Sequence, residues 1–273
     1  GGHGMSLRTV AVWSLVLLCG GSSAIASEFE IAAEAAGPPS AAVLASGDVV
    51  VAWAGPALAF GRRQPSLRVL DPEGVPRSQV VRLAPAAAEV DGPVVAALAS
   101  GGAVAVWAAA LPETSGGGVW VQRVGADGKP VGERIRVATR DFLSWDSVAV
   151  AGRPDGGFVV FWTGGAADGT SVLSRSFDWR GDPSGPVAGL SSPGPGYRCA
   201  PTVAALAGGG AVAVWEHEVP GAGGSSLVAR RLDAAGSAVG SELEVVSADD
   251  GWNRSPALAP TDGGGAVLVW RLG

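Results

Sequence analysis

The chain has little of several residue types, and each shortage argues against a class of protein. Among its 273 residues are two cysteines, two histidines, one tyrosine, one methionine and a single lysine, Lys129. The net charge is −6, without a run of basic residues. A nucleic-acid backbone is bound by clustered Lys and Arg side chains, so we expect no nucleic acid among the partners.

Cysteine and histidine are too scarce to suggest a disulfide framework or a metal site. Cys19 lies in the N-terminal apolar segment, so cleavage of that segment would leave Cys199 without a disulfide partner. Glu216 and Glu218 flank His217, but alternate residues of a strand point to opposite faces, whereas zinc needs three or four convergent ligands. We predict no metal, no cofactor and a fold held together by packing.

The N-terminus has the pattern of an export signal. Residues 9–26 carry no charge, and the apolar run at residues 10–18 has the length of a signal-peptide core. Ala24-Ile25-Ala26 before Ser27 matches a small-x-small cleavage site. We therefore divide the chain into a signal or anchor (residues 1–26) and a repeat domain (residues 27–273). The protein is expected to be periplasmic or extracellular, or membrane-anchored through residues 9–26 if they remain uncleaved.

A short sequence motif recurs five times along the repeat domain. A small apolar run, a glycine turn and a second apolar run end each time in tryptophan, with spacings of 54, 55, 53 and 55 residues between copies. The tryptophans are Trp53, Trp107, Trp162, Trp215 and Trp270. Such a period indicates a repeat architecture, and we expect the five tryptophans to be core residues near the ends of buried strands.

Two further segments complete the unit. An alternating segment often carrying arginine follows each of the first four tryptophans, as at residues 119–123 and 227–230. A further alternating segment opens the unit at residues 28–31, 134–137 and 242–245, and the last two of these follow a turn with Asp and Gly. Alternation of polar and apolar residues predicts a peripheral strand with one solvent-exposed face. The apolar runs, in contrast, should be buried on both faces.

Four strands in about 54 residues are typical of a β-propeller blade. We predict an all-β, propeller-like array of five blades. The alternating segment that follows each tryptophan is missing after Trp270, so the last blade should be incomplete. A β-sandwich or a solenoid remains an alternative.

The repeat resembles the tandem repeats of large bacterial secreted proteins, which carry Asp-Gly-Gly, Val-Val-Val-Trp and Gln-Arg-x-Asp-x-x-Gly-x-x-x-Gly. Residues 122–132 and 231–240 match it best, and the resemblance covers residues 28–273. It implies a propeller-like extracellular module. It implies no reaction, because these repeats share no catalytic residues.

The long connections of the meander share one end of the strands, the end at which the tryptophans stand, and variable loops on a rigid scaffold often carry function. Trp145, Tyr197 and Trp252 lie 17, 18 and 18 residues before their repeat tryptophans. With Arg198 and Arg254 they form a candidate binding rim for a protein or a glycan. The alternative is that each ring caps its own sheet and packs on the adjacent tryptophan.

No catalytic constellation is apparent. The sequence has no Gly-x-Ser-x-Gly elbow, and we find no acid that recurs at an inward strand position, as paired-carboxylate chemistry would require. We predict an exported, non-catalytic scaffold for binding or assembly. Two alternatives stay open: an accessory subunit of a membrane protein complex, held by an uncleaved N-terminal helix, and a carbohydrate-active enzyme.

Overall fold

The computed structural model describes residues 36–56, 58, 62–110, 117–139, 147–166 and 168–273. The predicted signal or anchor at residues 1–26, the alternating segment at residues 28–31 and the rim residue Trp145 lie outside these residues. No helix in the described ranges is long and apolar enough to cross a membrane.

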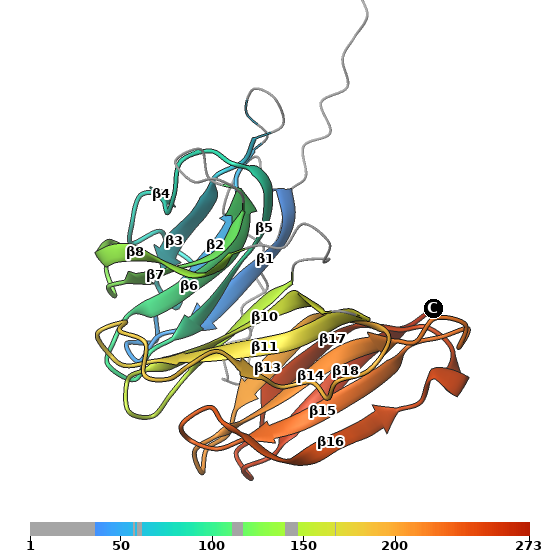
Figure 1. The fold of residues 1–273 in the computed structure, drawn as a ribbon. Helices are drawn as coiled ribbons and strands as arrows, with labels where there is room; N and C mark the ends of the chain where they lie inside the picture. The colour runs from blue at the N-terminus through green and yellow to red at the C-terminus, as the bar shows by residue number, and fades with distance from the viewer. Residues whose placement is uncertain (1–35, 57, 59–61, 111–116, 140–146, 167) are drawn as a thin grey trace, which may run out of the picture.

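The described chain forms five antiparallel sheets, and the sheets follow one another along the sequence (Figure 1). Four sheets have four strands, and the last has two. The strands are β1 (Ala36–Val43), β2 (Val49–Ala54), β3 (Pro65–Leu70) and β4 (Val81–Arg82); β5 (Ala88–Ala97), β6 (Ala103–Ala110), β7 (Gly118–Val124) and β8 (Pro130–Thr139); β9 (Val148–Gly152), β10 (Phe158–Ala166), β11 (Gly169–Phe177) and β12 (Ala188–Gly189); β13 (Tyr197–Ala205), β14 (Ala211–Glu218), β15 (Ser226–Leu232) and β16 (Ala238–Val246); β17 (Asn253–Pro260) and β18 (Ala266–Leu272). These sheets are called blades 1 to 5, and the prediction of five blades with an incomplete last one is confirmed.

Each blade is a meander whose first strand lies innermost. Neighbouring blades contact each other along these first strands, β1 with β5, β5 with β9, β9 with β13 and β13 with β17. In the described chain the first strands of blades 1 and 5, β1 and β17, do not make extensive contact with each other. The blades therefore form a propeller-like array that β17 and β1 do not close by direct packing.

Glycine turns join the first two strands of a blade because the backbone leaves no room for a side chain. Gly102, between β5 and β6, has φ of +72°, and a Cβ built on it would stand 2.2 Å from the carbonyl oxygen of Val124. Gly210 occupies the same place in blade 4, where a Cβ would stand 2.3 Å from the carbonyl oxygen of Leu232. Only glycine adopts this conformation without a clash, so the recurring Gly-Gly is a backbone requirement.

The core consists of layers between successive blades. Trp107 packs among residues of blades 1 and 2, Trp162 between blades 2 and 3, and Trp215 between blades 3 and 4. Trp53, Trp107, Trp162 and Trp215 are buried, whereas Trp270 in blade 5 is 45% exposed. The expected core role is confirmed for four tryptophans and is wrong for Trp270, beside which the described residues form no third strand.

The second strands β2 and β6 are buried on both faces, as expected, whereas β18 has no buried residue. The third strand of a blade was expected to have one solvent-exposed face. In β7 this is not so, because every residue except Arg123 is buried. β7 lies between β6 and β8 within a stack of blades, so neighbouring blades cover both of its faces. The alternating pattern therefore underestimated the burial of this strand.

Candidate functional site

Four of the five described innermost strands share an irregularity near the end where they begin, and β9 does not. The pairing of β1 with β2, β5 with β6, β13 with β14 and β17 with β18 slips there, as at a β-bulge. The repeat tryptophans stand at the same end, which we call the tryptophan end. Bulges are common beside functional sites because they redirect side chains.

Three of these bulges contain a residue with left-handed backbone geometry. Gly92 has φ of +83°, Ala200 has +48° and Ser255 has +55°. Each stands 15 residues before its repeat tryptophan. A non-glycine residue in this region costs roughly 1–2 kcal/mol, and such strain is often found at functional sites. The strained turns of Ala200 and Ser255 therefore mark the tryptophan end of blades 4 and 5.

Hydrogen bonds from neighbouring blades hold two of the strained turns in place. The Ala200 amide donates to the Ser147 hydroxyl at 2.8 Å, from blade 4 to the residue before blade 3. The Ser255 amide donates to Glu216 Oε1 at 2.6 Å, from blade 5 to blade 4. Blade packing and bulge geometry are therefore coupled at this end.

Glu216 is the centre of a small polar cluster between blades 4 and 5. It follows Trp215 on β14 and is only 6% exposed. Cys199 Sγ lies 3.6 Å from Glu216 Oε2, and Arg254 Nη1 lies 4.0 Å from the same oxygen. A carboxylate, a thiol and a guanidinium thus meet beside two bulged innermost strands.

The thiol of this cluster is not an activated nucleophile. Burial, and then the neighbouring Glu216 carboxylate, raise the pKa of Cys199 to about 12. The thiol therefore stays protonated at neutral pH and donates to Glu216, and the thiolate needed for nucleophilic attack does not form. The chemistry of the cluster rests on its carboxylate and its cation.

The residues of the predicted rim have different positions. Trp252 and Arg254 contact each other, with the guanidinium carbon 4.6 Å from the ring centroid. Tyr197 begins β13 and is 46% exposed. Arg198 is buried and donates to the carbonyl oxygens of Thr170 and Gly194. Trp252, Arg254 and Tyr197 thus remain available to a ligand, whereas Arg198 joins blade 4 to blade 3.

Burial lowers the pKa of the Arg198 guanidinium. Its main-chain amide also donates to the Thr170 hydroxyl at 2.6 Å, and that hydroxyl donates to the Arg198 carbonyl oxygen at 2.7 Å. Ser225 and Asn253 repeat this exchange between blades 4 and 5. Arg198 and Asn253 are therefore equivalent junction residues at the tryptophan end.

One acid on an innermost strand was not predicted as a site residue from the sequence. Asp91 lies in β5 at the bulge and pairs with Ala108. Asp91 stands 16 residues before its repeat tryptophan, Trp107. Cys199 and Arg254 stand the same number of residues before their own repeat tryptophans. Asp146 has the same separation in sequence from Trp162 and lies outside the described residues, so the expectation that no acid recurs at an inward position stays a prediction. Counting back from the tryptophans would have found both.

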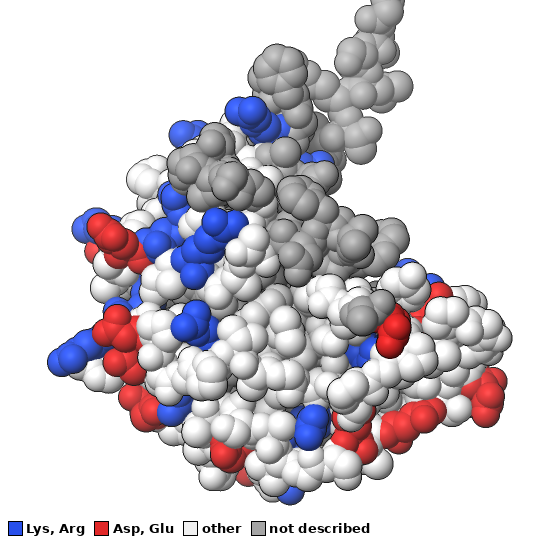
Figure 2. Space-filling model, viewed as in Figure 1, with Lys and Arg blue, Asp and Glu red and all other residues white. Residues whose placement is uncertain are grey.

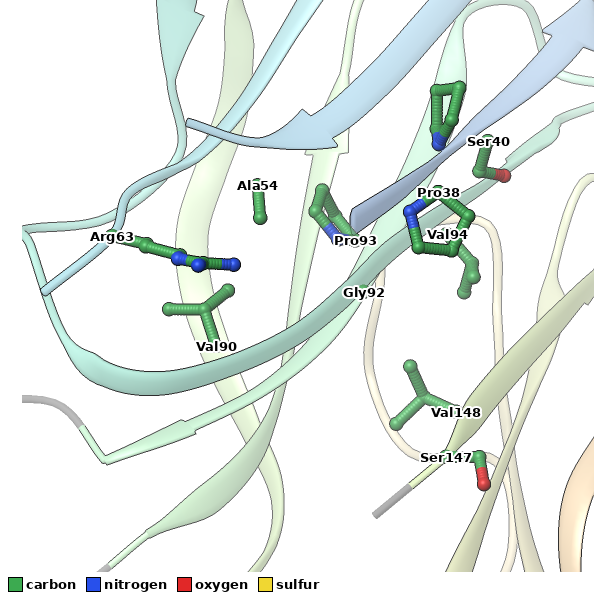
Figure 3. A pocket seen from close by; sticks show the side chains of 11 residues that line it. Pro38, Ser40, Ala54, Arg63, Val90, Gly92, Pro93, Val94, Ser147 and Val148 are labelled. Carbon is green, nitrogen blue, oxygen red and sulfur yellow. The ribbon is translucent and has the colours of Figure 1, made fainter. Parts of the chain in front are cut away.

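A cavity of about 200 Å³ opens at the same end, between blades 1, 2 and 3 (Figure 3). Its lining comes from β1, the end of β2, β5, the start of β9 and the segment before β3. Ser147 lines the cavity and accepts the hydrogen bond from Ala200, so the cavity lies beside the bulge of blade 4. The described residues contain no group of three side chains that could hold a metal ion.

No protein-family model matches the sequence, and no curated protein matches it. Solved structures do resemble it. An alpha-L-arabinanase from Penicillium chrysogenum, complexed with arabinobiose, is 14% identical at a TM-score of 0.58, over 86% of this chain and 74% of that one. An alpha-L-arabinofuranosidase from Fusarium graminearum, with an iminosugar inhibitor, is 13% identical at a TM-score of 0.59, with the same coverage of both chains.

At these identities the likeness establishes the propeller fold alone. It nevertheless contradicts our expectation of a non-catalytic scaffold, because these two structures are those of an arabinanase and an arabinofuranosidase. The alternative of a carbohydrate-active enzyme agrees better with these comparisons than the scaffold does.

Proposed function

We propose that this protein is a glycoside hydrolase whose active site lies at the tryptophan end, around the innermost strands. The observation that carries the proposal is that the tryptophan end holds bulged strands, a buried carboxylate at Glu216 beside the cation of Arg254, and a cavity between blades 1, 2 and 3. The fold likeness to an arabinanase and an arabinofuranosidase supports the same class of reaction.

Glycoside hydrolysis commonly needs two carboxyl groups, one to protonate the leaving oxygen and one to act as base or nucleophile. We assign this pair to Glu216 and Asp91. The Ser255 amide orients Glu216, and Asp91 has an innermost-strand position at the same end. Which of the two is the acid follows from the pH dependence of the variants.

Two aromatic residues at this end, the half-buried Trp252 and the exposed Tyr197, suit a sugar. Trp252 carries Arg254 over its ring, and Tyr197 stands at the start of the adjacent innermost strand. Aromatic side chains combine a large apolar face with a polar edge, which fits the mixed surface of a sugar ring. We propose that they hold sugar residues next to the cleaved bond, with Trp145 as a further candidate.

The test is hydrolysis of a glycan panel that begins with arabinan and arabinobiose. Asp91→Asn and Glu216→Gln should each lower kcat by roughly 10²–10⁴-fold, the usual contribution of a general acid or base. Glu133→Gln on the exposed part of β8 is the matched control and should keep wild-type activity. Failure of the wild-type protein to cleave any glycan, or full activity of both variants, would contradict the proposal.

Trp252→Ala tests the rim separately. It should raise KM while changing kcat little, because the ring would bind the substrate equally in the ground and transition states. Unchanged kinetics with a lower stability would instead assign the ring to packing.

We propose that the protein is periplasmic or extracellular. This location would suit a polymeric substrate and agrees with the resemblance to the repeats of secreted bacterial proteins. Sequencing the N-terminus of the native protein tests this. A start at Ser27 would support cleavage, whereas retention of residues 9–26 would favour the anchored form.

A further inference from the structure

The cavity between blades 1, 2 and 3 has an uneven distribution of charge. Its walls are largely apolar, with Pro38, Pro93, Val90 and Val148 among the lining residues. Arg63 is the one charged side chain among the described lining residues, and Figure 3 shows it reaching between Ala54 and Val90.

The main chain holds the base of the Arg63 side chain in a fixed place. Its amide donates to the Ala87 carbonyl at 2.8 Å, and the Ala87 amide donates back at 2.8 Å. These two bonds form an isolated bridge between the segment before β3 and the segment before β5. The guanidinium therefore projects from a rigid part of the backbone.

The guanidinium of Arg63 has no hydrogen bond or ion pair within the described chain, unlike comparable arginines. Arg68 Nε donates to the Ser78 carbonyl at 3.0 Å, and Arg136 Nη2 donates to the Gly117 carbonyl at 2.6 Å. A half-buried guanidinium keeps its positive charge and presents planar donors that match a carboxylate. Arg63 is thus positioned to accept an anionic group that enters the cavity.

A second donor faces the same space. The Ser40 hydroxyl lines the cavity and accepts the Val95 amide at 3.0 Å, which leaves its own proton available to a ligand. No Asp or Glu is among the described lining residues. The cavity therefore combines apolar walls with donors, and Asp91, which stands in the sequence between the lining residues Val90 and Gly92, is not itself among the described lining residues.

We propose that this cavity binds the carboxylate of a uronic acid residue, so that the substrate is an acidic glycan. The volume of about 200 Å³ is below the roughly 300–1,000 Å³ of common ligand pockets, which suits one sugar ring. Proline and valine walls would cover the apolar face of the ring, and Arg63 would pair with its carboxylate. This assignment rests on the proposed function, because it names the substrate class for the same end of the propeller.

The test measures binding and hydrolysis separately. Titration calorimetry compares galacturonate and glucuronate trisaccharides with the corresponding neutral trisaccharides. We expect the wild-type protein to bind an acidic trisaccharide roughly 10- to 100-fold more tightly than its neutral counterpart, as one charge-assisted pair would give. Arg63→Gln should remove this preference, whereas Arg62→Gln, at the exposed neighbouring residue, should keep it.

Equal affinity for acidic and neutral sugars, or an unchanged preference in Arg63→Gln, would overturn the proposal. Competition by inorganic phosphate or sulfate at equal concentration would also overturn it, because that result describes a general anion site. Hydrolysis of neutral glycans alone would refute the acidic substrate and leave the proposed function intact. Selective binding of uronates without hydrolysis of any glycan would support the cavity assignment and refute the enzyme.

Discussion

Blades 2 and 5 share the same repeat motif, yet their side chains differ sharply in burial. The second strand of blade 2, β6, is buried along nearly its whole length, whereas β18 has no buried residue. β6 is paired on both edges, by β5 and β7, and lies between blades 1 and 3. In the described chain β18 pairs with β17 alone. The repeat therefore specifies a strand, and neighbouring strands determine whether its side chains become core.

The two tryptophans of these blades show the same contrast in their polar atoms. Trp107 is fully buried, and its indole N–H has no hydrogen-bond partner in the described chain. Trp270 is half exposed, and its indole N–H donates to Asn253 Oδ1 at 3.1 Å. Trp107 is thus held by packing, whereas Trp270 is held partly by a polar contact.

The largest expected difference comes from removing each ring. Trp107→Ala should lower the free energy of unfolding by roughly 3–5 kcal/mol, because it leaves a cavity between two blades. Trp270→Ala should cost about 1 kcal/mol, since much of that ring already contacts water. Urea denaturation of both variants measures the difference. Equal losses would show that another chain covers β18 in solution and would remove the contrast between the blades.

The junction between blades 4 and 5 depends on Asn253, which is fully buried. Its amide nitrogen donates to the carbonyl oxygens of Ser225 and Ser247 at 2.7 and 3.0 Å. Asn253→Ala should cost roughly 1–3 kcal/mol, because those buried acceptors lose their donor. Asn253→Asp should be at least as damaging, since a carboxylate cannot donate to them. A fully stable Asp variant in thermal unfolding would contradict this role.

Cys199 makes the seam between blades 4 and 5 sensitive to alkaline pH. Burial raises the pKa of this thiol from its ordinary value of 9.0 to about 12 in the folded protein. The unfolded chain thus loses the thiol proton first, so this stabilisation is complete below pH 9 and disappears between pH 9 and 12. By pH 9.5 the wild-type protein should have lost about 1 kcal/mol relative to Cys199→Ala. Parallel pH profiles for the two proteins would show that burial of the thiol is not responsible.

The smallest effect is expected at the exposed strand itself. Val269 on β18 is 58% exposed, whereas Val106, at the same repeat position on β6, is fully buried. Val269→Thr should change the free energy of unfolding by no more than about 0.5 kcal/mol. Val106→Thr buries a hydroxyl without a partner and should cost roughly 1–3 kcal/mol. A loss of stability in Val269→Thr as large as that in Val106→Thr would mean that the exposed face of β18 is covered in solution.

Much of the fold could be predicted because its signals are local. The spacing of the tryptophans indicated the blades, and the Gly-Gly pairs marked turns that the structure shows to be backbone requirements at Gly102 and Gly210. The wet face expected of the third strand was wrong for β7, because alternation in sequence does not reveal that blades lie against both faces.

The site was less predictable because it depends on pairs of residues distant in sequence. Arg198 looked like a rim residue, yet its partner Thr170 lies 28 residues earlier and draws it into the junction. Glu216 was considered from the sequence as a metal ligand beside His217, and it is buried against Cys199 and the Ser255 amide. The bulges were missed, since a slip of register is defined only by the neighbouring strand.

By itself the sequence determined the strands, the turns, the number of blades and the unequal last blade, because apolar periodicity and glycine spacing act over a few residues. Only the tertiary structure decided which tryptophans are core, which charges are buried and where a cavity forms beside Arg63. The physical reason is that burial and hydrogen bonding at the tryptophan end join residues from different blades, and no local pattern records those partners.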